Sequence, residues 1–195
     1  MKKVILVIAA IMATMSVQAQ DEKMNELSVS YGLGVSTIGD GLGNAIGNGI
    51  IDNWSGCKWD NTKRFGTLAV EYFRHLNNPR VAVGGIVTFA QFGEDVVKKE
   101  SNAKVGDRTR KYISVMPSIK YYWVNGKNFG FYSKAAAGVT MLNYNDSQAT
   151  SSSKVYFTGQ ASPIGLEAGS SSFRGFIEAG AGEQGFVLAG LRVRF

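Results

Sequence analysis

The sequence predicts an all-β fold, an eight-stranded antiparallel up-and-down transmembrane β-barrel. Eight segments alternate apolar and polar residues with a period of two, which indicates strands with one apolar face. The connections alternate between long and short, as in outer-membrane barrels, where short turns lie on one side and longer loops on the other. After residue 20 no apolar stretch is long enough for a transmembrane helix, so any membrane crossing must be made by strands.

The composition excludes several other classes of protein. The chain has 195 residues, of which 45% are hydrophobic and 18% charged, so it is neither disordered nor a coiled coil, and its length suits one domain. The net charge of +6 includes two lysines at the extreme N-terminus, and the remaining excess is too scattered to indicate nucleic-acid binding. Cys57 is the only cysteine, which excludes an intramolecular disulfide and a cysteine metal cluster.

The first residues predict a secretory signal peptide. Two lysines precede an apolar run over 4–13, and Val17 and Ala19 supply the small residues of a cleavage site before Gln20. The run is too short for a transmembrane helix, and no cysteine follows it to accept a lipid. We therefore expect a signal peptide over 1–19, a barrel over 20–195, and a bacterial protein that lies beyond the inner membrane.

The predicted strands are, in order, 27–36, 64–76, 81–93, 109–123, 129–142, 155–168, 173–182 and 187–195. The alternation is explicit in six of these, where the apolar face is carried by Leu27, Val29, Tyr31, Leu33 and Val35; Leu68, Val70 and Tyr72; Val81, Val83, Val87 and Phe89; Ile113, Val115, Ile119, Tyr121 and Trp123; Phe129, Phe131, Ala135, Ala137, Val139 and Met141; and Val187, Ala189, Leu191, Val193 and Phe195. Long outer loops are expected at 37–63 and 94–108, and one of medium length at 143–154. Short connections are expected around 77–80, 125–126, 170–172 and 183–185, with Asn125-Gly126 as a strong hairpin signal.

Two prolines interrupt predicted strands. Pro117 and Pro163 cannot donate a hydrogen bond to a neighbouring strand, so each predicts a bulge or a register break. At Pro163 we expect the inward and outward positions to exchange. The outward residues would then be Val155, Phe157 and Ala161 before the proline, and Ile164 and Leu166 after it.

The end of the chain resembles a known export signal. Alternate apolar residues lead to a terminal aromatic, as in the C-terminal assembly signal that barrel-insertion machinery reads in outer-membrane proteins; here they are Val187, Ala189, Leu191, Val193 and Phe195. In a closed barrel this strand pairs with the first. The stretches 162–166, 175–182 and 191–195 are similar to small outer-membrane β-barrel proteins common in Bacteroidetes, with the architecture of OmpA and OmpX. The resemblance implies an outer-membrane location and a barrel fold, and it implies no activity.

Charged residues fall on the inward positions of the predicted strands. They are Glu71, Lys120, Lys134, Glu178 and Arg192. The interior of an eight-stranded barrel is just wide enough for side chains to fill, so we expect these charges to pair and plug it, in preference to an ion or proton pathway. If the last hairpin is centred on Gly185, Glu178 lies directly opposite Arg192.

No catalytic, cofactor or metal site is expected. His75, the only histidine, falls at the periplasmic end of its strand, far from outer-leaflet lipid. The spacings of Asp40, Asp52 and Asp60 match no calcium loop, and the glycines between 39 and 49 lack the strand and helix of a phosphate-binding loop. Aromatic residues are instead expected in girdles at the membrane boundary; they are Trp54, Trp59, Tyr121, Tyr122 and Trp123.

The favoured hypothesis is a monomeric, non-enzymatic outer-membrane barrel with a structural or surface-interaction role through its outer loops. Its expected partners are outer-membrane lipid, the barrel-assembly machinery and an unidentified extracellular partner. A second hypothesis is binding or passage of a small hydrophobic ligand, suggested by small inward residues such as Ala82, Gly84, Ala136 and Gly138. A third is an enzyme that modifies outer-leaflet lipid.

Overall fold

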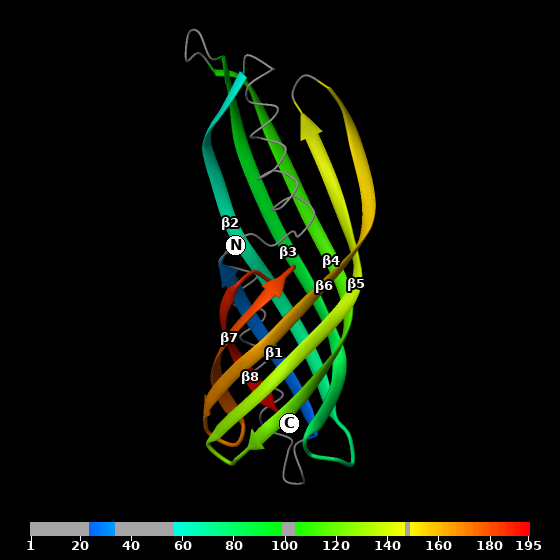
Figure 1. Cartoon of the computed structure of the whole chain (residues 1–195), viewed down its shortest axis with the longest axis vertical. Coiled ribbons are helices and arrows are strands. Elements are labelled where there is room, and N and C mark those ends of the chain that lie inside the picture. Colours follow the sequence, from blue (N-terminus) through cyan, green and yellow to red (C-terminus); the bar gives the residue numbers. More distant parts are fainter. Residues whose placement is uncertain (1–23, 34–56, 99–103, 147–148) are drawn as a thin grey trace.

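Eight strands form a closed antiparallel barrel in which each strand pairs with its neighbours in the chain (Figure 1). The computed structural model describes residues 24–33, 57–98, 104–146 and 149–195. The strands are β1 (Asn25–Leu33), β2 (Cys57–His75), β3 (Val81–Lys98), β4 (Lys104–Asn125), β5 (Phe129–Asp146), β6 (Ala149–Gly169), β7 (Phe173–Gly182) and β8 (Val187–Arg194). The predicted fold class is confirmed. Among these residues there is no helix with the length and apolar character needed to cross a membrane.

The strands differ greatly in length. β1, β7 and β8 have 9, 10 and 8 residues, whereas β2 to β6 have between 18 and 22. Much of what was predicted as outer loop is therefore strand, because the hairpins continue as backbone ladders such as Asp95↔Asp107 through polar sequence that carries no apolar alternation. The rest of the predicted loops, and residues 34–36 of the first predicted strand, lie outside the described residues.

The barrel has one end with short turns, which we call the turn end. Three connections, 76–80, 126–128 and 170–172, lie there together with the C-terminus (Figure 1). The first and last strands also meet there, where Asn25 N donates to Phe195 O at 2.8 Å and Phe195 N donates to Asn25 O at 2.9 Å. β1 and β8 pair from Glu26↔Arg194 to Leu33↔Val187, so the last strand closes the barrel against the first as predicted.

The two prolines behave differently. At Pro163 the register of β6 shifts against both neighbours, and the outward side passes from Ala161 to Ile164, so the predicted exchange of faces is confirmed. At Pro117 the prediction of a bulge or register break is wrong. Gly85↔Pro117 continues the β3 register, and the β5 pairing skips Met116 and Pro117 but resumes unchanged at Ser118. The missing N–H group of Pro117 therefore interrupts the pairing of β4 with β5 without shifting its register.

The outer face of the barrel is apolar. Outward positions of every strand carry exposed apolar side chains. One row of directly paired residues crosses six neighbouring strands, in which Val29 is half-buried and the others are exposed: Leu191, Val29, Val70, Val87, Val115 and Val139. In β8, Val187 and Leu191 are exposed, whereas Val193 is buried.

Within the barrel, an apolar cluster of Ala69, Ile86 and Met116 packs with Ala136. The inward glycines mark places where strands approach closely. A Cβ atom on Gly84 would lie 1.8 Å from the carbonyl oxygen of Tyr72, and one on Gly138 would lie 2.1 Å from that of Val115. These glycines therefore relieve backbone crowding and do not open a cavity for a ligand.

Candidate functional site

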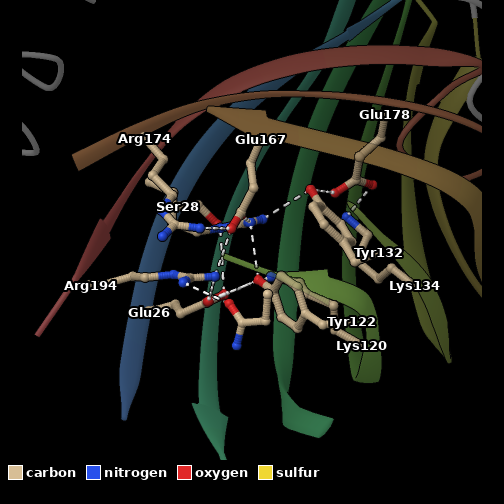
Figure 2. A network of polar contacts seen from close by, with 12 residues as sticks. Glu26, Ser28, Lys120, Tyr122, Tyr132, Lys134, Glu167, Arg174, Glu178 and Arg194 are labelled. Atoms are coloured by element: carbon tan, nitrogen blue, oxygen red, sulfur yellow. Dashed lines mark hydrogen bonds and ion pairs between the residues drawn. The ribbon is translucent and has the colours of Figure 1, made fainter. Parts of the chain in front are cut away.

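The interior between the apolar cluster and the turn end holds a network of buried charges (Figure 2). Four carboxylates and five cations belong to it, all with less than a tenth of their surface exposed: Glu26, Glu71, Glu167, Glu178, Lys120, Lys134, Arg174, Arg192 and Arg194. Every strand except β3 contributes at least one of them. Buried charges persist only when they are paired and hydrogen-bonded, so the contacts of each carboxylate decide what the network does.

Glu26 is one centre of the network. Its carboxylate accepts hydrogen bonds from Lys120 Nζ at 2.8 Å and from the Tyr122 hydroxyl at 2.8 Å. Arg194 Nη2 makes an ion pair with it at 2.8 Å, and His75 Nε2 lies 2.7 Å from it. The only histidine of the chain is thus a buried partner of a structural carboxylate at the turn end.

Glu167 is a second centre and contacts three guanidinium groups. Arg174 Nη1 and Arg194 Nη2 donate to it at 2.5 Å and 2.6 Å, and Arg192 Nη1 donates to its other oxygen. Arg174 also donates through Nη2 to two backbone carbonyl oxygens of the turn after β4, each at 2.8 Å. The network therefore fastens a turn as well as the strands.

Lys134 joins the other two carboxylates. Its Nζ lies 2.6 Å from Glu71 Oε1 and 2.7 Å from Glu178 Oε2. Glu71 also accepts a hydrogen bond from Gln184 Nε2 at 2.7 Å, and Glu178 accepts one from the Tyr132 hydroxyl at 2.8 Å. One ammonium group thus links β2, β5 and β7 across the interior.

The five charged residues singled out in the sequence all lie in this interior, but one predicted pair is wrong. Glu178 faces Leu188, and Arg192 faces Arg174, because the β7–β8 hairpin is centred on residue 183 and not on Gly185. The turn starts directly after Gly182, whose φ of 136° is a conformation that favours glycine. Arg192 and Glu178 are connected through Tyr132, whose hydroxyl accepts from Arg192 Nη2 at 3.2 Å and donates to Glu178 Oε1 at 2.8 Å.

Four members of the network were not singled out in the sequence: Glu26, Glu167, Arg174 and Arg194. Arg194 shares the inward parity of Arg192, and Glu167 becomes inward once the faces exchange at Pro163. The same alternation could therefore have predicted that both residues face the interior. Glu26 precedes the predicted start of the first strand, and Arg174 lies in a glycine-rich segment without a clear alternation.

The aromatic prediction is right in part. Tyr121 and Trp123 point outward and pack edge to face with ring centroids 4.8 Å apart, and Trp123 Nε1 donates to Ser133 Oγ. Tyr122 is not a girdle residue, because it lies on the inward parity and its hydroxyl binds Glu26. Trp59 and Asp60 lie in β2 and not in a loop. Trp54, Asp40, Asp52 and the glycines from 39 to 49 lie outside the described residues.

The β7–β8 turn closes the interior on the side opposite the turn end. Glu183 and Gln184 are buried, so this connection folds inward. Thr158 Oγ1 donates to Glu183 Oε2 at 2.7 Å, and Gln184 N donates to Gln160 Oε1 at 2.8 Å. Together with the hydrogen bond from Gln184 to Glu71, these contacts fix the turn to the network.

The contacts of the network join strands and turns to one another. In the described part of the chain no three His, Cys, Asp or Glu side chains gather as a metal site would require. The histidine binds a carboxylate, and its ring stacks on Tyr122 with centroids 5.4 Å apart. A hydrolytic triad requires that histidine to bind a nucleophile as well. What the site does is hold seven strands and two turns to one another.

Comparison with known proteins gives few matches. No protein-family model matches the chain, and no curated protein matches it in sequence. Among solved structures, Ail, the attachment invasion locus protein of Yersinia pestis, matches with 16% sequence identity and a TM-score of 0.41, over 89% of this chain and 96% of that chain. Ail in complex with the heparin analogue sucrose octasulfate matches at 16% identity and a TM-score of 0.40, over 88% and 95% of the two chains. The resemblance to a group common in Bacteroidetes has no counterpart among these matches.

Proposed function

We propose that the chain is a non-enzymatic outer-membrane β-barrel that presents a projecting β-sheet to an extracellular partner. The observation that carries the proposal is that β2 to β6 continue past the point where the barrel closes. β2 pairs with β1 only from Thr67 onward, and β6 pairs with β7 only from Gln160 onward. The remaining lengths of these strands form an open sheet above the closed ring (Figure 1).

Membrane insertion is supported by the reversed distribution of polarity. The outer face carries exposed apolar side chains on every strand, whereas the nine charged side chains of the network are buried inside. A large exposed apolar surface is unfavourable in water and favourable against lipid. The closed barrel also leaves no unpaired strand edge within the hydrocarbon, as a membrane requires. The predicted signal peptide over 1–19 supports export, and the C-terminal residues Val187 to Phe195 support assembly into the outer membrane.

Interaction with a partner is supported by the edge of the projecting sheet. Within the described residues, the strand pairing of β6 from Ala149 to Thr158 is with β5 alone, whereas Gly159 O also accepts a hydrogen bond from Glu183 N at 3.0 Å. Two side chains on this edge, Val155 and Phe157, are 63% and 88% exposed. An exposed edge strand offers unpaired backbone groups to an added strand, and apolar side chains beside them provide further contact area.

The two other hypotheses fit the geometry less well. Passage of a hydrophobic ligand requires a hollow interior, whereas the apolar cluster, the charged network and the inward β7–β8 turn occupy it. A lipid-modifying enzyme requires a histidine beside a nucleophile near the outer leaflet, whereas His75 binds Glu26 at the turn end.

The proposal is tested in a bacterial host that expresses the full chain. We expect the protein in the outer-membrane fraction, and we expect protease added to intact cells to cleave only the projecting strands. Cells should bind a labelled extended peptide that alternates apolar and polar residues, because such a peptide can add as a strand to the exposed edge, and Phe157→Ser should reduce this binding several-fold. Lys111→Ser, on a strand paired on both sides, is the control and should have no effect. Periplasmic protein, or peptide binding equal to that of cells without the chain, would contradict the proposal.

A further inference from the structure

The outer face of the barrel has an apolar groove of about 380 Å³ over β5 to β8. Its lining includes Phe129, Leu166, Ala168, Gly175, Ile177 and Ala189. The volume lies at the lower end of the range of sites that hold small molecules.

The groove arises from two small residues beside a large one. Phe129, Ala168 and Gly175 are direct neighbours across β5, β6 and β7. A Cβ atom added to Gly175 would meet nothing within 4 Å, so the glycine leaves open space and answers no steric requirement of the barrel. Phe129 forms one wall of the space, and Leu166 and Ile177, paired with each other, form another.

Two polar turns adjoin the strands that line the groove, and one of these turns carries a positive charge. Phe129 begins β5 and Ala168 lies one residue before the end of β6, so the groove opens at the turn end. The turn before β5 carries Lys127, whose side chain is exposed, and the turn after β6 consists of three serines, 170–172. Neither turn contains a carboxylate.

We propose that this groove binds one acyl chain of a membrane phospholipid, whose phosphate lies against Lys127. The inference rests on the proposed membrane location and goes beyond it by naming a specific lipid site. An apolar groove next to a turn with an exposed cation matches an anionic amphiphile, and basic residues at a membrane surface attract anionic head groups. A second copy of the chain fits less well, because a symmetric interface would place the two Lys127 side chains of the pair on the same contact.

Native mass spectrometry of the folded barrel tests the site. The protein is refolded in vesicles of phosphatidylglycerol and phosphatidylcholine, extracted in detergent and measured for retained lipid. We expect one phosphatidylglycerol to remain bound. Gly175→Leu adds a side chain at a position where a Cβ atom meets nothing within 4 Å, and it should lower the retained fraction about tenfold by occupying the groove; Lys127→Gln should lower it about fivefold.

Two matched controls separate the site from general lipid contact. Gly85→Leu also places a leucine at an outward glycine, where the nearest atom is 3.9 Å away, and Arg80→Gln removes a cation from another turn at the same end. Both should leave lipid retention unchanged. Equal retention in wild type and Gly175→Leu would overturn the lipid site while leaving the barrel in the membrane. A dimer that disappears in Gly175→Leu would assign the groove to a second copy instead. A chain that does not insert into vesicles would overturn the membrane proposal itself, and with it the lipid site.

Discussion

Lys134→Met is expected to destabilise the barrel strongly. The lysine is buried, and its ammonium group is the shared partner of Glu71 at 2.6 Å and Glu178 at 2.7 Å. Methionine is similarly long and flexible, so the change removes the charge with little loss of packing. It leaves two carboxylates short of a cation, and breaking a buried ion pair in this way costs about 3–5 kcal/mol in the free energy of unfolding.

Neighbouring donors limit the loss at these carboxylates without replacing the ammonium group. Glu71 keeps its hydrogen bonds from Ser28 and Gln184, and Glu178 keeps the one from Tyr132. The cost therefore belongs at the lower end of that range, about 3 kcal/mol. Urea unfolding in lipid vesicles, with the folded fraction read from heat-modifiable gel mobility, measures it.

A double change and a surface control complete this test. Adding Glu178→Gln to Lys134→Met removes one uncompensated carboxylate, so the double variant should regain 1 kcal/mol or more, roughly the coupling of directly contacting charges. Lys154→Met, on an exposed position of β6, should change stability by no more than about 0.5 kcal/mol. If Lys134→Met matches the Lys154 variant, or the two interior changes are additive, the buried triad does not stabilise the barrel.

Three further outcomes are expected. Mass measurement of the membrane form should show a mature chain that begins at Gln20, because the apolar run ends before Ala19; a retained Met1 would contradict this. Deleting Phe195 removes its backbone exchange with Asn25 and the terminal aromatic of the expected assembly signal, so pulse-chase fractionation should show slower insertion, and an unchanged rate would exclude that role. Planar bilayers should show no large steady conductance for the wild type, since side chains fill the interior between the β7–β8 turn and the turn end, and an open pore would refute that filling.

The strands were predictable because a barrel wall has two chemically different faces. Each strand of the wall must therefore alternate apolar and polar residues, and the outward residues Val70 and Val87 belong to such alternating runs. The parts of β2 to β6 beyond the closed ring were not predictable in this way, because their sequence carries no regular apolar alternation. Asp95 and Asp107 therefore pair across a ladder that leaves no apolar trace in the sequence.

The interior charges were predictable as a set but not as pairs. Parity assigns Lys134 and Glu178 to the inside, whereas contact depends on how eight tilted strands bring side chains together across a closed space. The position of one turn decides the rest: moving the hairpin centre from Gly185 to residue 183 replaces Arg192 with Leu188 opposite Glu178. Long side chains then reach partners on strands that are not adjacent, as Arg192 does with Glu167.

We infer that the charged network fixes the register of the barrel. A slip of one residue in a strand exchanges its two faces. In β8 it would move Arg192 and Arg194 toward lipid, at a cost of roughly 2–4 kcal/mol for each arginine near the bilayer midplane and less near its boundary. The same slip would also remove the arginines that pair with Glu26 and Glu167. The cost of placing arginine against lipid and the cost of the unpaired buried carboxylates therefore add. With an apolar interior such a slip would be far less costly, because both faces of the strand would be apolar and their exchange would place no charge against lipid. Charges placed inside, one or more on every strand except β3, therefore select a single pairing that the apolar outer face alone does not specify.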